Sequence, residues 1–439
     1  MKLISRTILL LLLAALLLST WTFDRNEWRS LLGDEATYLM AAESLAWDFD
    51  LTYERHDFDR FVEHWQRKPE GLILQSGDSG GRITFGKPFF YPLLLAPFVR
   101  LSPLRGPFVA NALLLILTAW IAARTLRRPL GDAAPLWVAV LLFGSIAFAY
   151  TYWAQADLLL LCATGIGLGL AHADPESASG SDKSSNRAPA DEPTAARVAL
   201  RWAAVGALLG LVIFSRPFYL PLLLPALLAL PRRRWRPAAV ALVLGAAGLA
   251  LAAGLVHRAN SGSWTAYGAE RGGFYERIGY PAVDFPAEDW DRTMSELGNA
   301  AWAEARTPGR LPRTDSSLWR WNGLYLLLGR NIGILPYFLP VVLGLVAAGR
   351  RRWWLLLAVA LSICGFLLYR PFNFYGGGAA LANRYFMPLY PALWYLIARR
   401  RAVLWPCAVA LLAALFLWPT WSRPRADPLT PAHTYRYVS

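Results

Sequence analysis

Both cysteine and charge are scarce in this 439-residue sequence. The three cysteines are Cys162, Cys364 and Cys407, and each lies inside an apolar run. This arrangement argues against a disulfide framework or a zinc site, and we interpret the cysteines as small core residues. Charged residues make up only 17% of the chain, whereas hydrophobic residues make up 56%. A soluble protein of this length carries more charge, so the composition argues against one.

The chain contains instead a series of long apolar runs. Runs of roughly 17–20 residues recur along nearly its whole length, which is the span that a helix needs to cross a bilayer. They are continuous rather than alternating, which disfavours a transmembrane barrel. We therefore predict an all-α polytopic membrane protein with about 11 transmembrane helices. The predicted spans are 7–23, 107–123, 133–151, 154–171, 198–214, 217–230, 238–256, 331–348, 353–370, 385–398 and 402–419.

The net charge of +14 comes with short arginine clusters between these runs, which is not the pattern of a nucleic-acid-binding stripe. The clusters lie at 124–128, 232–236, 350–352 and 399–401. Basic clusters of this kind stay on the cytoplasmic side, and placing all of them there makes the predicted spans alternate. The N-terminus is then cytoplasmic and the C-terminus outside. Lys2 and Arg6 precede the first run, and since no small-residue cleavage site follows, we predict an uncleaved helix.

This predicted topology requires that the segment Pro88–Leu101 does not cross the membrane. Four prolines interrupt the stretch Pro88–Pro103, so we predict a juxtamembrane or re-entrant helix there. The chain then divides into an N-terminal module, 1–172, with a first outer loop at 24–106, and a C-terminal module, 198–419, with an outer loop at 257–330. The Ser/Ala/Pro/Asp-rich segment 173–197 is predicted to be a disordered cytoplasmic linker, and 420–439 a short outer tail.

Several polar residues share the outer face in this topology. Asp34 and Glu35 follow the first span, in the stretch GDEATYLMAAESL. The other candidates are Lys87, Tyr91, Asp157, Arg216, Arg330, Asn331, Asn383 and Arg384. An acid pair, separated cations and many aromatic residues suit an anionic lipid headgroup joined to a sugar. The outer face has no ATP and no nucleotide sugars, so a sugar donor has to arrive already activated, most simply as a polyprenyl phosphate.

A transfer reaction of this kind needs cations and one base. Negative charge develops on the departing polyprenyl phosphate, and Lys or Arg stabilises it. The attacking hydroxyl gains from a carboxylate base within hydrogen-bond reach. Retention of configuration would need a second carboxylate about 5 Å away, as the nucleophile. Since Asp34 and Glu35 are neighbours on a helix and point in different directions, we predict a single base and inversion.

GDEATYLMAAESL, followed later in the same loop by FGKPFFYPLLLAP, resembles the GT-C glycosyltransferase superfamily. The similarity is to the branch of the protein O-mannosyltransferases and lipid A aminoarabinose transferases. In that branch the first acid of the pair is catalytic, and a Lys-Pro motif closes the loop beside juxtamembrane helices. The resemblance implies that Asp34 is the base and that Lys87 contacts the donor phosphate. Asp157, and Arg384 within GGGAALANRYFMPLYP, resemble weaker downstream patterns of the branch.

The resemblance leaves the acceptor open, as a lipid, a glycan or a protein. Phe89 stands where the family often has a second proline, and only a short tail follows the last predicted span. The site is expected at the outer face of a cytoplasmic (inner) membrane. Two other functions stay open: a transporter or flippase for lipid-linked or anionic substrates, and a non-catalytic scaffold subunit.

A divalent metal is a further candidate partner of the first outer loop. Its possible ligands are His56, Asp57, Asp59, Glu63 and His64, with His257 at the outer end of a later span. Their spacing matches no recognised ligand pattern, so we favour a solvated face and assign no metal to the site. Gly376–Gly378 lacks the strand-to-helix context of a nucleotide loop, so no nucleotide is assigned.

Overall fold

The computed structural model describes residues 2–24, 31, 33–76, 82–173, 194–289, 316–349, 352–369, 381–398 and 403–422. Most of the predicted linker 173–197 and of the tail 420–439 lies outside these ranges. The Gly376–Gly378 triplet, the arginine cluster 399–401 and Arg350–Arg351 of the cluster 350–352 also lie outside them. The described helices are α1 (Lys2–Trp21), α2 (Asp34–Trp47), α3 (Arg55–Trp65), α4 (Phe90–Leu101), α5 (Gly106–Leu130), α6 (Ala134–Phe143), α7 (Ala156–His172), α8 (Ala195–Ser215), α9 (Leu223–Leu228), α10 (Trp235–Ser261), α13 (Ser316–Leu328), α14 (Ile334–Tyr337), α15 (Val341–Val346), α16 (Trp353–Tyr369), α17 (Tyr390–Trp394) and α18 (Leu404–Ser422).

Within the described residues, five helical stretches are long and apolar enough to cross a membrane. They are Leu3–Trp21, Gly106–Phe143, Ala195–Ser215, Arg232–Ser261 and Leu404–Ser422, and four shorter apolar helical stretches accompany them. The Gly106–Phe143 stretch changes direction at Gly131, which has a positive φ of 60° and separates α5 from α6. The prediction of a helical, polytopic membrane protein is confirmed, whereas the number of eleven spans stays a prediction.

Prolines break three of the predicted spans into short helices. The span predicted at 331–348 consists of α14 and α15, with Pro340 between them. The one at 217–230 begins as a 3-10 helix, Pro217–Leu222, and continues as α9. The one at 385–398 contains the five-residue helix α17 after a 3-10 turn. Proline lacks the backbone N–H and clashes with the preceding turn, so apolar composition alone overestimated these helices.

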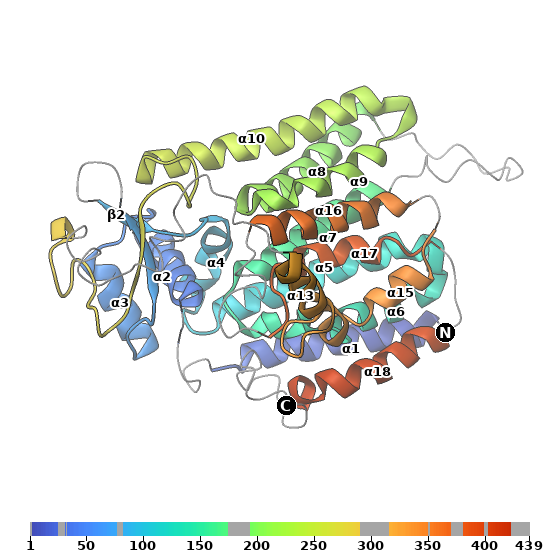
Figure 1. Cartoon of the computed structure of the whole chain (residues 1–439), viewed down its shortest axis with the longest axis horizontal. Coiled ribbons are helices and arrows are strands. Elements are labelled where there is room, and N and C mark those ends of the chain that lie inside the picture. The colour runs from blue at the N-terminus through green and yellow to red at the C-terminus, as the bar shows by residue number, and fades with distance from the viewer. Residues whose placement is uncertain are drawn as a thin grey trace, which may run out of the picture.

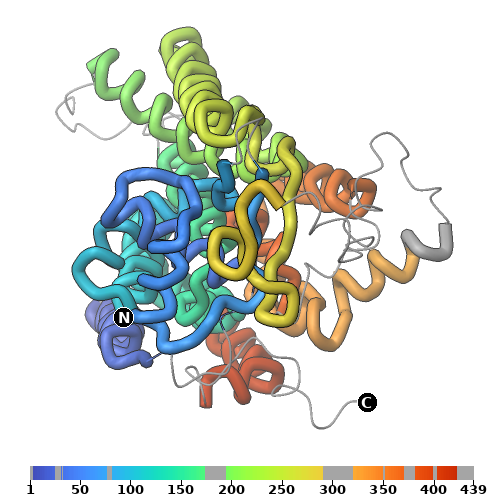
Figure 2. The backbone as a smooth tube through the Cα atoms, turned by 90° about the vertical axis from the view of Figure 1, so that its left-hand side faces the viewer, coloured from blue at the N-terminus to red at the C-terminus, as the bar shows by residue number. Residues whose placement is uncertain are grey.

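A small antiparallel sheet joins two segments that are far apart in sequence. Its strands are β1 (Leu72–Ser76), β2 (Ile83–Phe85) and β3 (Arg271–Phe274), in the order β2-β1-β3. Leu74 pairs with Phe85 on one side, and Leu72 pairs with Phe274 on the other. Figure 2 shows the yellow segment that contains β3 against the blue first loop. The all-α prediction omitted this sheet.

The helices α2, α3 and α4 and the sheet gather at one end of the molecule, opposite the N-terminal end of α1 (Figure 1). α4 packs along α2, most of whose residues are buried. α4 has 12 residues and is therefore about 18 Å long, at 1.5 Å per residue. This length is less than the ~30 Å thickness of the hydrocarbon core of a bilayer. Its length therefore agrees with a juxtamembrane helix over Pro88–Leu101.

Glycines allow α8 and α10 to pack with their backbones in close approach. A Cβ atom added to Gly206 would overlap the backbone oxygen of Leu242, and one added to Gly245 would overlap that of Ala203. Small residues at such positions are how membrane helices associate without a hydrophobic driving force between them. α10, whose C-terminal end lies beside the sheet (Figure 1), is thereby held against the rest of the bundle.

Gly245→Ala is expected to lower the stability of the protein, by about 1–3 kcal/mol for overpacking against a backbone that has to shift. Gly248→Ala, one turn along the same helix, is the matched control because its added Cβ meets nothing within 4 Å. Thermal unfolding of the two purified variants in detergent measures the difference. Equal midpoints for both variants would contradict the close approach of α8 and α10.

Candidate active site

The backbone around Gly33 sets the position of Asp34. Gly33 has a φ of +52°, a left-handed conformation that glycine adopts without strain, and α2 begins at the next residue. Its N–H donates to the carbonyl of Glu70 at 2.5 Å. The Thr37 hydroxyl donates to the Gly33 carbonyl at 2.8 Å and accepts from the Ile73 N–H at 2.9 Å. The first turn of α2 is thus fastened to β1, with Asp34 at the positive end of the helix.

Asp34 is held by two cations from distant parts of the chain. Its Oδ1 lies 2.5 Å from Lys87 Nζ, and its Oδ2 lies 2.7 Å from Arg384 Nη1. The three side chains are only 12–15% exposed. Lys87 follows β2, where the Gly86 N–H donates to the Ile73 carbonyl at 3.0 Å. The structure therefore brings together in one cluster three residues that were separate candidates in the sequence: Asp34, Lys87 and Arg384.

The electrostatics of this cluster keep Asp34 ionised. Burial disfavours the carboxylate, but the charges of Lys87 and Arg384 outweigh it and hold the pKa of Asp34 well below its usual range. Burial is also the largest influence on Lys87, and with repulsion from Arg271 and Arg384 it lowers the pKa of Lys87 to about 8. Lys87 is therefore a cation at neutral pH that loses its charge at moderately alkaline pH.

A second ion pair lies deeper in the same region. Asp157 Oδ1 lies 2.6 Å from Arg216 Nη1, with 1% of the aspartate side chain and 14% of the arginine side chain exposed. Asp157 stands in the first turn of α7, and Arg216 directly follows α8. In both pairs the acid comes from the predicted N-terminal module, 1–172, and the arginine from the predicted C-terminal module, 198–419, so the site forms only when the two modules pack together.

A pocket with mainly aromatic and apolar walls adjoins the second pair. Its lining residues are Tyr38, Pro88, Phe90, Tyr91, Ala156, Leu159, Leu160, Ser215, Arg216 and Tyr267. The Tyr91 hydroxyl donates to Asn111 Oδ1 at 3.0 Å, and its ring meets that of Tyr38 edge-on at 5.3 Å. The predicted binding residue Tyr91 is therefore part of a pocket wall that combines apolar surface with the charge of Arg216.

Glu35, predicted together with Asp34 as a catalytic residue, faces a different part of the structure. It is fully buried, and its Oε1 accepts a hydrogen bond from the backbone N–H of Ala154 at 3.3 Å. Adjacent residues on a helix point about 100° apart, so one acid can serve the backbone before α7 while the other meets Lys87 and Arg384. Of the two acids, Asp34 is the one that contacts Lys87 and Arg384.

Three other candidates form hydrogen bonds that involve backbone groups near Arg384: Arg330, Asn331 and Asn383. The Asn331 carbonyl accepts from the Ala382 N–H at 2.6 Å. Asn383 Oδ1 accepts from the Tyr385 N–H at 3.0 Å, and the Arg330 carbonyl accepts from the Tyr337 hydroxyl at 2.8 Å. These contacts position the turn.

Two residues that were not predicted from the sequence also touch the charged cluster. Gln155 Oε1 accepts from Arg384 Nη1 at 3.4 Å, and the ring of Tyr385 lies against both Arg216 and Arg384. Gln155 is two residues before Asp157, and Tyr385 is next to Arg384, so proximity to a candidate was the only signal available.

The residues considered for a metal do not form one cluster. His64 Nδ1 lies 3.2 Å from the buried Glu43, and Asp59 pairs with Arg55 at 3.4 Å. His257 instead packs between the rings of Phe89 and Phe214. The group expected at this end of the molecule is thus divided among three different environments.

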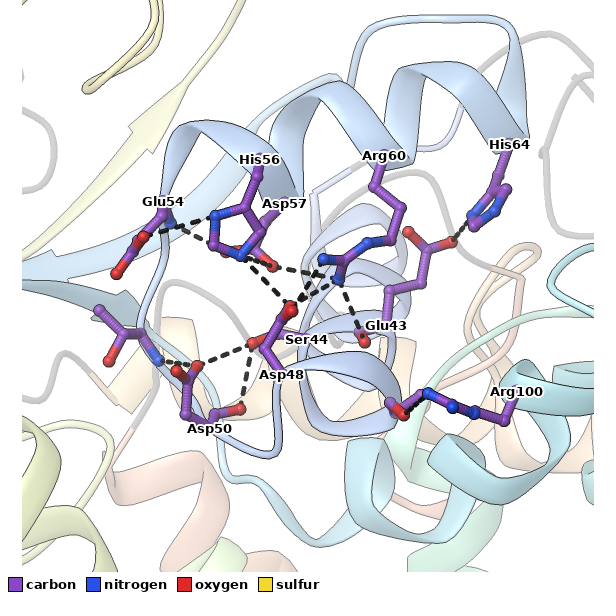
Figure 3. A network of polar contacts seen from close by, with 12 residues as sticks. Glu43, Ser44, Asp48, Asp50, Glu54, His56, Asp57, Arg60, His64 and Arg100 are labelled. Carbon is purple, nitrogen blue, oxygen red and sulfur yellow. Dashed lines mark hydrogen bonds and ion pairs between the residues drawn. The ribbon is translucent and has the colours of Figure 1, made fainter.

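Asp48, His56 and Asp57 do place three ligand atoms within 4.8 Å of one another. Arg60 points into this group (Figure 3), with Nη1 2.7 Å from Asp48 Oδ2 and 3.5 Å from Asp57 Oδ1. A guanidinium group thus balances the two carboxylates, and the arrangement fits an ion-pair network between α2 and α3 better than a metal centre.

The structure of this chain is similar in overall arrangement to some solved structures. No protein-family model and no curated protein matches the sequence. The chain is similar to ArnT from Cupriavidus metallidurans bound to undecaprenyl phosphate, with 16% identity and a TM-score of 0.46, over 94% of this chain and 62% of that one. It is also similar to the Archaeoglobus fulgidus oligosaccharyltransferase in the apo form, with 13% identity and a TM-score of 0.43, over 98% of this chain and 57% of that one.

Both structures are glycosyltransferases of the GT-C class, which the sequence motifs also resemble. The chain spans less than two thirds of the length of either structure. At these identities and TM-scores the likeness concerns overall arrangement only, so function has to be inferred from the residues of the site.

Proposed function

We propose that this protein is an integral membrane glycosyltransferase that moves one sugar from a polyprenyl-phosphate donor to an acceptor hydroxyl. The observation that carries this proposal is the cluster in which Asp34 contacts Lys87 and Arg384. A carboxylate and two cations match a reaction that needs a base and a stabilised anionic leaving group.

The proposed reaction is a single displacement at the anomeric carbon. The acceptor oxygen forms a bond to that carbon, and Asp34 takes the hydroxyl proton. The bond from the carbon to the phosphate oxygen breaks, and the electron pair leaves with the polyprenyl phosphate. Lys87 and Arg384 stabilise the charge that develops on the phosphate. One displacement with one base inverts the anomeric configuration.

We place this reaction at the extracytoplasmic face of the cytoplasmic membrane. The segment Arg232–Arg234 directly precedes α10, and α10 begins at the end of the molecule opposite α2 and the sheet (Figure 1). Basic residues between spans are retained on the cytoplasmic side. This orientation supports a location of Asp34 and its partners on the other side, where an activated lipid donor is required.

Mass spectrometry of lipid and glycan extracts tests the proposal in cells that lack the gene. These cells are expected to lose a single-sugar increment on one lipid, glycan or protein, and to accumulate the matching polyprenyl-phosphate sugar. Complementation with the wild-type gene should restore the increment. Extracts that are the same with and without the gene would overturn the proposed function, and loss of a translocated solute without any lost sugar would favour a transporter.

The pH dependence of transfer is expected to report the charge of Lys87. Because the pKa of Lys87 is lowered to about 8, the lysine is a cation below that pH and neutral above it. The value of kcat/KM for the donor should therefore fall above about pH 8, since it reports groups of the free enzyme. Lys87→Arg keeps its charge over this range and should remove the fall. A wild-type profile that stays flat to pH 9.5 would contradict this role.

A further inference from the structure

One tyrosine ring contacts the arginines of both ion pairs. The guanidinium carbon of Arg216 lies 4.2 Å from the centroid of the Tyr385 ring, and that of Arg384 lies 5.5 Å from it. Arg216 is bound to Asp157, and Arg384 is bound to Asp34. Tyr385 is therefore the aromatic residue that links the two charged pairs of the candidate site.

The surrounding residues fix this ring in place. The Tyr385 carbonyl accepts from the Tyr219 hydroxyl at 2.6 Å, and its N–H donates to Asn383 at 3.0 Å. The ring also contacts that of Phe366 at 4.9 Å and meets that of Phe218 edge-on at 6.1 Å. With hydrogen bonds on its backbone and aromatic neighbours on its ring, Tyr385 has little freedom to move away from the arginines.

The position of the ring answers an electrostatic problem. Two guanidinium groups repel each other in a largely buried site, and the charge of Arg216 acts against that of Arg384. The face of an aromatic ring carries partial negative charge and attracts a cation within about 6 Å. A fixed ring in contact with both arginines can thus hold both of them near one point without adding a formal negative charge that would repel a phosphate.

We propose that Tyr385 is a positioning residue that holds Arg216 and Arg384 together so that both act on the phosphate headgroup of the donor lipid. This inference rests on the proposed function and extends it, because it makes Arg216 and Asp157 part of headgroup recognition. The ring itself contacts the arginines, and its effect on the phosphate is transmitted through them.

Binding of undecaprenyl phosphate to the purified protein in nanodiscs tests the inference, with undecaprenol as the probe that lacks the phosphate. Tyr385→Leu removes the aromatic face and is expected to weaken binding of undecaprenyl phosphate about tenfold, as for the loss of a desolvated cation–π contact. Tyr385→Phe retains the ring and should stay within about threefold of the wild type. Neither substitution should change binding of undecaprenol.

A second set of variants separates positioning from a general structural effect. In an Arg216→Gln background, Tyr385→Leu should cost less affinity than it does in the wild type, because one of its two partners is absent. Phe338→Leu is the matched control, since Phe338 is a buried aromatic residue that packs on Phe386 and Tyr390. This variant should lose thermal stability without losing affinity for the phosphate.

The outcomes distinguish this inference from the proposed function. If the wild type binds undecaprenyl phosphate no better than undecaprenol, the proposed function fails and the role of Tyr385 fails with it. If the wild type prefers the phosphate but Tyr385→Leu binds it equally well, only the inference about Tyr385 is overturned. Equal losses for Tyr385→Phe and Tyr385→Leu, or strictly additive losses with Arg216→Gln, would overturn it as well.

Discussion

Asp34→Asn is expected to abolish sugar transfer and, at the same time, to tighten the binding of undecaprenyl phosphate. Asparagine has nearly the same shape as aspartate but cannot take the proton of an acceptor hydroxyl, and a positioned base contributes about 10²–10⁴-fold to such a rate. Loss of the carboxylate also leaves Lys87 and Arg384 without their shared anion. A lipid phosphate should then meet less competition, and its affinity should rise by about tenfold.

The opposite signs of these two effects follow from the geometry of the site. The same two cations that would bind the donor phosphate hold Asp34, and they keep its pKa well below the range of an effective base. A phosphate that shares Lys87 and Arg384 would weaken their interaction with Asp34, so we expect the pKa of Asp34 to rise when the donor is bound. Donor binding would therefore prepare the base for the acceptor.

The measurements for Asp34→Asn are the sugar increment in complemented cells and the affinity of the purified variant for undecaprenyl phosphate. Asp59→Asn is the matched control, since Asp59 is exposed and pairs only with Arg55 among the ion pairs of the described residues. It should leave both quantities unchanged. Transfer that persists in Asp34→Asn would remove Asp34 from the role of base, and weaker lipid binding would show that the carboxylate does not compete with the phosphate.

Asp157→Asn is expected to have the largest effect on stability. The substitution leaves the guanidinium of Arg216 in a largely buried site without its counter-charge, and removal of one partner from a buried ion pair costs about 3–5 kcal/mol. The double variant Asp157→Asn/Arg216→Gln should recover much of this loss, because it leaves no unpaired charge behind. It should still fail to transfer sugar, since Arg216 is absent from the site.

Thermal unfolding in detergent measures these differences, with Asp132→Asn as the surface control. Asp132 and Arg127 are 3.9 Å apart and about half exposed, so their interaction should contribute less than about 1 kcal/mol. If Asp157→Asn unfolds at the wild-type temperature, the pair with Arg216 does not form in the protein. If the double variant is less stable than the single one, the pair acts through contacts other than its charges.

Local sequence was sufficient for the long helices and for the residues of the first loop. α1, α8, α10, α16 and α18 all lie close to their predicted positions, because an apolar run of membrane length leaves a helix few alternatives. The lengths of the helices in the short, proline-containing segments were overestimated. Whether a proline ends a helix there depends on which neighbours satisfy the freed carbonyl groups, and a single sequence does not contain that information.

The pairing of the charged residues required the folded chain. The sequence placed Asp34, Lys87, Asp157, Arg216 and Arg384 on one face, but it did not indicate which arginine meets which acid. It also gave no sign that β3 joins β1, or that Tyr385 lies against both arginines. Such contacts join segments up to 350 positions apart, as for Asp34 and Arg384.

The sequence by itself determined that this protein is helical and lies in a membrane, and it selected Asp34 and Lys87 as candidates, because hydrophobic length and short motifs are local properties. Only the tertiary structure decided that these residues meet Arg384, that Glu35 turns away toward Ala154, and that Tyr385 connects the two ion pairs. The physical reason is that charges interact across a few ångströms of space, and packing of segments that are far apart in sequence sets those distances.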